Sequence, residues 1–225
     1  MVSDTDDGSP DAQPKEPVAP GELAHLMAHD LRTPLEVAFG RLELARSTGE
    51  REHLAAVLAA LERMDELIDD LAALGAAADS VDSPEPVDLA AVAHASWDLL
   101  APTEARLTVD ADGPVLANRS RLRQLLANLL QNAVEHAGPA VHVRVGLTAD
   151  GTVLFVSDDG DGIPRQINGH ALEPGVSTAP NGTGYGLVVV QRMAAAHGWT
   201  LALTESATGG TRVELHGIEQ PEPSP

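Results

Sequence analysis

The stretch "LMAHDLRTPLE", residues 26 to 36, places a histidine, an acid, a hydroxyl and a proline inside an otherwise helical apolar pattern. Pro34 has no N–H for the carbonyl of Asp30, so we expect a helix that can bend just past His29. Thr33 follows His29 by one helical turn and lies on the same face. Asp30, the next residue along, does not naturally face the ring. The stretch therefore predicts a helix that presents a titratable side chain for chemistry.

The sequence around this stretch predicts two helices. Apolar residues recur at helical spacing from Gly21 to about Arg46, "STGE" interrupts them, and a second run extends from Glu50 to Leu74. Two such helices form an αα-hairpin, and its apolar stripe has little else in the segment to pack on. We expect it to pair with its own copy as a four-helix bundle; packing against the rest of the chain is the alternative. The second run forms a heptad seam of Leu54, Leu58, Leu61, Met64, Ile68 and Leu71.

Composition limits the class of protein. The 225 residues contain no cysteine, and 34 acids face 14 basic residues, with Lys15 as the single lysine. A net charge of −20 disfavours nucleic acid and anionic membranes as partners. We find neither a membrane-spanning segment nor a leader peptide, and we expect a cytoplasmic protein. The acidity fits either an arginine-using, alanine-rich genome or, as we favour, adaptation to molar salt, where the Debye length is about 3 Å.

The chain divides into five segments by composition. Residues 1–20 are acidic and proline-rich and are predicted to be a disordered tail. Residues 21–77 form the helical hairpin, 78–88 an acidic, proline-containing linker, and 219–225 a second disordered tail. Residues 89–218 change to mixed helix and strand. That segment is predicted to fold as an α+β sandwich with helices at 89–100, 119–137 and 185–197, and strands at 105–110, in "VHVRVGL" and "TVLFVSD", at 199–205 and at 211–215.

Three motifs in residues 89–218 indicate a phosphate-binding site. "SDDGDGIP", 157 to 164, follows a strand, and its glycines permit close backbone approaches. "NGTGYGL", 181 to 187, runs into a helix, whose first N–H groups can hold phosphate. Asn128 and Asn132 share one face of a leucine-rich helix and need polar partners, which an oxygen-preferring cation with a nucleotide would provide. Each motif has an ordinary structural explanation when taken alone.

Taken in order, "HDLRTP", "NLLQNA", "DDGDGIP" and "GTGYGL" resemble the H, N, G1 and G2 boxes of sensor histidine kinases of two-component systems. The likeness spans roughly residues 22 to 217, and "LEPGVST" and "AHGW" further resemble haloarchaeal members. It implies a dimerisation and phosphoacceptor hairpin, followed by an ATP-binding domain of the Bergerat (GHKL) fold. The implied cofactors are ATP and Mg²⁺.

The resemblance also assigns roles to individual residues. His29 would accept the γ-phosphoryl group and Asp30 would orient its ring or take its proton, while Thr33 would support dephosphorylation of a partner. Asn132 would ligate magnesium beside Asn128, and Asp158 would accept a hydrogen bond from the adenine amino group. The remaining histidines are expected to be structural. The glycine-rich boxes would shape the nucleotide pocket and its lid, through Gly160, Gly162, Gly182, Thr183, Gly184 and Gly186.

The implied partners are the receiver domain of a response regulator, a second copy of the chain bound through the hairpin, and a separate sensor or input protein. The signal, the cognate regulator and the choice between cis and trans transfer are not given by the sequence. Two residues depart from the family: Glu135 stands where many members carry Lys or Arg near the phosphates, and Leu172 replaces the usual phenylalanine before "EPG". Arg165, Arg192 or a hydrated cation are candidates to compensate Glu135.

Two other functions remain open at this stage. The same ATP-binding fold occurs in chaperones and mismatch-repair ATPases, which act as nucleotide-driven dimer switches. Those hydrolytic relatives typically carry glutamate where Asn128 stands, and an amide cannot accept the proton of an attacking water. The other alternative is a catalytically silent scaffold that binds partners through the hairpin, which the acid at Glu135 keeps open.

Overall fold

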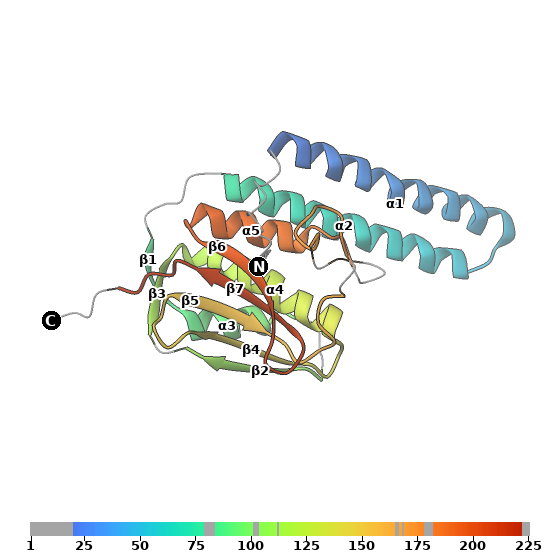
Figure 1. The fold of residues 1–225 in the computed structure, drawn as a ribbon. Coiled ribbons are helices and arrows are strands. Elements are labelled where there is room, and N and C mark those ends of the chain that lie inside the picture. The colour runs from blue at the N-terminus through green and yellow to red at the C-terminus, as the bar shows by residue number, and fades with distance from the viewer. Residues whose placement is uncertain are drawn as a thin grey trace, which may run out of the picture.

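The computed structural model describes residues 20–78, 84–100, 104–111, 113–164, 167, 169–177 and 182–221. A long helical hairpin lies along one side of a mixed domain of helices and strands (Figure 1). This confirms the predicted fold class of a helical hairpin followed by an α/β sandwich. The disorder predicted for both tails concerns residues that fall almost entirely outside the described ranges, at 1–19 and 222–225.

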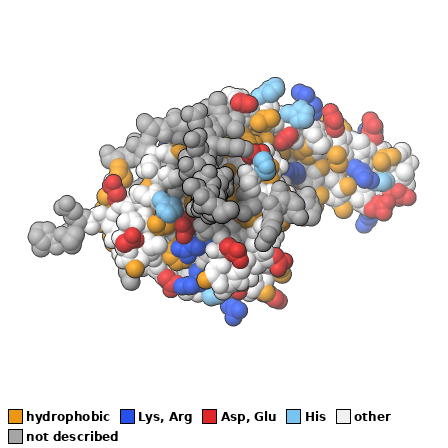
Figure 2. Space-filling view, viewed as in Figure 1, with side chains coloured by type: hydrophobic (Ala, Val, Ile, Leu, Met, Phe, Trp, Pro, Cys, Tyr) orange, Lys and Arg blue, Asp and Glu red, His pale blue; other side chains and the backbone are white. Residues whose placement is uncertain are grey.

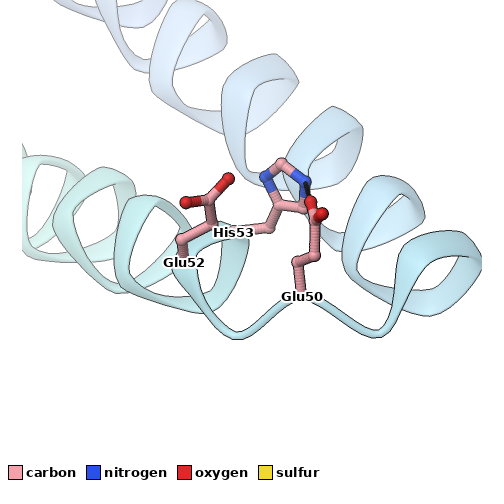
Figure 3. A group of neighbouring side chains, drawn as sticks. All are labelled: Glu50, Glu52 and His53. Atoms are coloured by element: carbon pink, nitrogen blue, oxygen red, sulfur yellow. Dashed lines mark ion pairs between the residues drawn. The ribbon is translucent and has the colours of Figure 1, made fainter.

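Helices α1 (Pro20–Thr48) and α2 (Glu52–Ala78) form the hairpin, each slightly longer than the sequence pattern predicted. Helix α1 continues through Pro34 rather than ending before it. At the turn, Glu50, Glu52 and His53 come together (Figure 3). The His53 ring is buried; Nε2 lies 3.2 Å from Glu50 Oε2 and Nδ1 lies 3.4 Å from the guanidinium of Arg41. Since both ring nitrogens have partners and one of these is a cation, this cluster closes the hairpin turn.

The mixed domain is built on a five-stranded sheet in the order β2-β4-β5-β7-β6. Strand β2 runs parallel to β4, and every other neighbouring pair is antiparallel. Helices α3 (Leu89–Trp97), α4 (Arg119–Ala137) and α5 (Gly186–Ala196) pack against it (Figure 1). The strands are β2 (Arg106–Asp110), β4 (His142–Leu147), β5 (Val153–Ser157), β6 (Thr200–Glu205) and β7 (Thr211–His216).

Alternation along the strands separates the two faces of this sheet. Leu154 and Val156 of β5 join the core with the helices, whereas the Phe155 ring between them is covered by the guanidinium of Arg212, 3.8 Å from the ring centroid. Successive side chains of a strand point to opposite faces, so the first face carries the core. Helix α4 supplies much of it through Leu122, Leu125, Leu126, Leu129 and Leu130.

Two strands were not predicted. Strand β1 (Glu85–Asp88) pairs antiparallel with β3 (Pro114–Ala117), although residues 78–88 were predicted to be a linker. Val87 and Val115 are fully buried at the centre of this pair. The end of the predicted linker is therefore part of the mixed domain. Four-residue strands that contain proline and pair across a long stretch of chain leave little alternation to detect.

The hairpin carries two apolar stripes with different surroundings. Leu23, Met27, Leu67 and Leu74 are buried and belong to the same core as the mixed domain. Most of the predicted heptad seam is uncovered: Leu54, Leu58, Leu61 and Ile68 are each at least half exposed, whereas Leu71 at its end packs against the core. Apolar side chains are visible along the hairpin surface in Figure 2. None of the helices in the described ranges combines the length and apolar character needed to cross a membrane.

His197 closes the end of α5 as a neutral ring. Its Nδ1–H donates to the carbonyl of Met193 at 2.7 Å, its Nε2 accepts from the backbone N–H of Asn118 at 3.1 Å, and it stacks on Trp199. Burial lowers the pKa of His197 below 6.5, outweighing the Met193 hydrogen bond, which raises it. This supports the prediction that His197 is structural.

The pKa of His197 leads to a pH dependence of folding. As pH falls below 6.5, the unfolded chain takes up a proton that the native ring resists, so this residue makes stability fall with falling pH. The variant His197→Gln should be less stable at pH 8 and should lose less stability than the wild type between pH 7.5 and 5.5. Urea denaturation across that range measures both curves. Parallel curves would contradict the assignment of a neutral native ring.

Candidate active site

A cavity of about 130 Å³ lies between α4, strands β5 and β7, and the loop before α5. The side chains of Leu129, Val156 and Val213 form apolar parts of its lining, and Asp158 and Asn132 are among its polar groups. A mostly apolar cavity with few fixed polar groups is typical of a small-molecule site. The described lining also includes the predicted residues Gly162, Gly182, Thr183, Gly184 and Gly186.

Asp158 is held at the end of β5 by backbone contacts on several sides. Its Oδ1 accepts hydrogen bonds from the N–H groups of Gly160 and Thr211, both at 3.0 Å. The hydroxyl of Ser206 donates to its carbonyl at 2.7 Å. Burial raises the pKa of Asp158 more than these hydrogen bonds lower it. A fixed, buried carboxyl that lines a cavity is suited to accept one further hydrogen bond from a ligand.

Two glycines around Asp158 are required because neighbouring atoms leave no room for a side chain. A Cβ on Gly160 would lie 2.3 Å from the Cβ of Ala137, and one on Gly210 would lie 2.4 Å from the carbonyl oxygen of Asp158. Gly162 adopts a φ of +73°, which side chains rarely tolerate. The prediction singled out Gly160 and Gly162 but missed Ser206, Gly210 and Thr211, which reach Asp158 from the β6–β7 turn. No motif marked that turn.

Asn128 and Asn132 face a second hollow of about 320 Å³, between α4 and α2, and Asn132 also lines the first cavity. The Nδ2 atom of Asn128 is buried without a hydrogen-bond partner in the described part of the chain. Gly186 leaves room for Asn132, whose amide oxygen lies 3.1 Å from where a Cβ would stand. The two amides therefore lie together where the first cavity meets the hairpin.

Acidic side chains line this second hollow. Glu66, Asp69 and Asp70 of α2 face Glu135 of α4. Burial raises the pKa of Asp70, and the negative charges of Asp69 and Glu135 raise it further. The pKa of Glu66 is raised in the same way, with Arg63 acting in the opposite direction from 3.6 Å. Nothing in the sequence pattern separated these acids from an ordinary solvated helix face.

Glu135 stands where the sequence departs from the family pattern, and its hydrogen-bond partner is neutral. The side-chain amide of Gln131 donates to its carboxylate at 2.7 Å. Of the groups considered as compensation, Arg165 lies outside the described residues. Arg63, which sequence reasoning did not select, is a cation close enough to Asp70 and Glu66 to lower the pKa of both.

His29 lies on α1 with a largely exposed side chain, and its Nδ1 is 3.3 Å from Asp30 Oδ1. The neighbouring acid thus reaches the ring, although helical spacing did not favour it. Thr33 is also exposed on α1. The residues predicted for the site therefore fall into two groups: one around the first cavity and one on the hairpin.

The loop at residues 182–186 contacts both groups. The hydroxyl of Thr183 donates to Asp70 at 2.6 Å, and the hydroxyl of Tyr185 donates to Asp30 at 2.8 Å. Gly184 between them has a φ of +73°, and a Cβ there would lie 2.4 Å from the carbonyl carbon of Gly175. The contacts of Tyr185 and Asp70 were not predicted.

Comparison with protein families matches both parts of this arrangement. Residues 21–77 match the His Kinase A (phospho-acceptor) domain, and residues 117–220 match the histidine kinase-, DNA gyrase B-, and HSP90-like ATPase family. The chain carries the phospho-acceptor domain and the ATPase domain of histidine kinases. The first match covers the hairpin with His29, and the second covers the cavity with Asn132 and Asp158.

Known histidine kinases align with most of the chain. The sensor histidine kinase TrcS of Mycobacterium tuberculosis is 34% identical over 86% of the chain and 43% of its own length. ZraS of Klebsiella oxytoca is 35% identical over 85% of the chain and 44% of its own length. This histidine kinase chain thus spans less than half the length of these relatives.

Solved structures agree with the fold. The Acinetobacter baumannii histidine kinase AdeS superposes with a TM-score of 0.65 at 21% identity, over 85% of this chain and 97% of the other. Full-length ShkA, solved with AMPPNP, gives a TM-score of 0.58 at 26% identity, over 91% of this chain and 47% of the other.

The tight loop at Gly184 leads to a prediction about stability. In Gly184→Ala the new Cβ meets backbone at 2.4 Å in a conformation that L residues rarely adopt, so we expect a loss of about 2 kcal/mol of unfolding free energy. Gly75→Ala is the matched control, because Gly75 lies in α2 with open space around it and should gain up to about 1 kcal/mol. Urea denaturation measures both. Equal effects in the two variants would contradict the strained loop.

Proposed function

We propose that the protein is an ATP-dependent histidine kinase that phosphorylates its own His29 and passes the group to an aspartate of a response regulator receiver domain. The observation that carries this proposal is the convergence of Asn132 and Asp158 on one cavity whose loop touches the acceptor helix beside His29. The activity of the whole protein is inferred from a chain that spans part of its relatives.

The residues around the cavity fit a nucleotide with magnesium. Asp158 would accept a hydrogen bond from the exocyclic amine of adenine, and Gly160 and Gly162 would shape the pocket by letting the backbone pack closely beside Asp158. Asn132 would hold Mg²⁺ through its oxygen, beside Asn128, whose Nδ2 has no hydrogen-bond partner among the described residues. The lid residues Gly182, Thr183, Gly184 and Gly186 would close over the phosphates. When bound, Mg²⁺ neutralises phosphate charge, which matters in a hollow that is already lined by acids.

The proposed chemical step uses the neutral ring of His29. The Nε2 lone pair forms a bond to the γ-phosphorus while the bond from that phosphorus to the bridging oxygen breaks, leaving ADP. The proton on Nδ1 is held toward Asp30, whose carboxylate stabilises the positive charge that develops on the ring. Phosphoryl transfer requires mainly position and charge compensation, which these groups provide.

Two partner proposals follow from the hairpin. The exposed heptad seam favours a homodimer through a four-helix bundle, because half-exposed leucines at heptad spacing gain most when they face a second copy. The receiver domain would dock near His29, where Thr33 is exposed one turn away; its role in dephosphorylating the receiver remains a hypothesis. A separate sensor or input protein, and a cytoplasmic location, also remain predictions.

Hydrolysis by a nucleotide-driven switch is less well supported. Asn128 stands where the hydrolytic relatives have a base, and an amide cannot take a proton from water. The silent scaffold is tested by the same experiment as the kinase.

Incubation with γ-labelled ATP tests the function. The wild type should gain an acid-labile, base-stable phosphoryl group, and His29→Ala should gain none while binding ATP within a few fold of the wild type. Asp158→Asn should weaken ATP binding by tenfold or more, because a hydrogen bond to a charged group is worth about 1.5–3 kcal/mol. Light scattering should still find a dimer in both variants. Label on His29→Ala would place the acceptor elsewhere, and an unlabelled wild type would favour the scaffold.

We further propose that the protein is of the haloarchaeal, salt-adapted type. The net charge of −20 with a single lysine supports this, since self-repulsion is screened only at high ionic strength. The melting temperature and the rate of autophosphorylation should both rise as potassium chloride increases from about 0.1 M toward molar levels. A melting temperature that does not change with potassium chloride concentration would contradict the proposed salt adaptation.

A further inference from the structure

Tyr185 connects the nucleotide-binding domain to the acceptor site. Its ring is almost fully buried in the shared core, and its hydroxyl donates to Asp30 Oδ2 at 2.8 Å across 155 positions of sequence. The other carboxyl oxygen, Oδ1, lies 3.3 Å from His29 Nδ1. One carboxylate therefore bridges a rigid side chain of the G2 loop and the acceptor ring, within a single chain.

The direction of the donors along this bridge is fixed by chemistry. A carboxylate only accepts, so the phenolic O–H donates to one of its oxygens and the ring can donate to the other through Nδ1–H. Burial raises the pKa of Tyr185, and the hydrogen bond to Asp30 raises it further, so the hydroxyl remains a donor at any physiological pH. With the proton kept on Nδ1, the lone pair is on Nε2, which is the atom that must attack phosphorus.

Asp30 needs such an anchor. Its side chain is 42% exposed and sits next to His29 on a helix, where neighbouring side chains do not face each other. Without a second partner the carboxylate would sample several rotamers, and the contact with the ring would be lost in some of them. The packed ring of Tyr185 selects one rotamer because the tyrosine itself cannot move.

The same loop is tied to α2 as well. Thr183 donates to Asp70 at 2.6 Å, so the loop before α5 contacts both helices of the hairpin while it lines the nucleotide cavity. A change in the conformation of this loop on nucleotide binding would therefore alter the position of the Asp30 side chain.

We propose that Tyr185 is a positioning residue for phosphoryl transfer, which holds Asp30 against His29 and thereby sets the ring tautomer that makes Nε2 the nucleophile. The inference rests on the proposed kinase function and adds to it a residue of the nucleotide-binding domain that acts on the acceptor. The phosphoryl group itself is not touched by Tyr185 in this scheme.

The test is the substitution Tyr185→Phe in the full chain, which keeps the packed ring and removes only the donor. The kcat of autophosphorylation should fall about tenfold, part of the effect typical of a positioned acid or base, while the KM for ATP stays within twofold. In an Asp30→Asn background the same substitution should cause no further loss of kcat, because the carboxylate through which Tyr185 acts is already absent. Equal kcat in Tyr185→Phe and the wild type, or fully additive losses in the double variant, would overturn the proposal.

A second measurement does not depend on activity. Nitrogen-15 NMR of the His29 ring should find the proton on Nδ1 in the wild type and a mixture of tautomers in Tyr185→Phe. An unchanged tautomer would also overturn the proposal. Failure of the kinase function looks different: the wild type would then take up no label at all, whereas the tautomer shift would still be measurable.

Discussion

Two hydrogen bonds from one short loop fix how the hairpin sits on the nucleotide-binding domain. Apolar contact through Leu67 and Leu74 drives the association, but burial of apolar area has no preferred direction. The hydroxyls of Thr183 and Tyr185 each meet a carboxylate on a different helix, so sliding or rotating the hairpin would break at least one bond. Each bond to a charged acceptor is worth about 1.5–3 kcal/mol, enough to select one docking arrangement among several that bury similar area.

Negative charge is the second constraint on this interface. Partial burial is the largest cause that raises the pKa values of Asp70 and Glu66, and Glu135 faces them across the hollow beside Asn132. A triphosphate adds charge of the same sign, so its entry is favourable only with cations that accompany it. Arg63 offsets part of the charge from the hairpin side.

Much of the fold was predicted from local sequence patterns. The parts that were missed share one cause, which is that they depend on contacts between residues far apart in the sequence. Helix α4 matched its prediction at both ends because Asn118 caps it and Gly138, with a φ of +102°, ends it. The β1–β3 pair was missed because its partners are four residues long and far apart in sequence. In the site, Asn132 and the predicted glycines other than Gly160 line the described cavity together. The contacts of Tyr185, Asp70 and Arg63 were not predicted. A polar residue has the same local sequence pattern whether solvent or another domain covers it.

The hairpin has two apolar stripes, one covered by the nucleotide-binding domain and one exposed. Leu67 and Leu74, seven residues apart on α2, are covered by the nucleotide-binding domain, whereas Leu54, Leu61 and Ile68 repeat at the same interval and remain exposed. Docking of that domain covers Leu71 at the end of the seam and leaves Leu54, Leu61 and Ile68 exposed, where a second copy would cover them. His29 belongs to neither row and keeps a side chain that is 72% exposed. The ring proposed as the acceptor would therefore stay accessible to a phosphoryl donor or a receiver while a second copy covers the exposed seam.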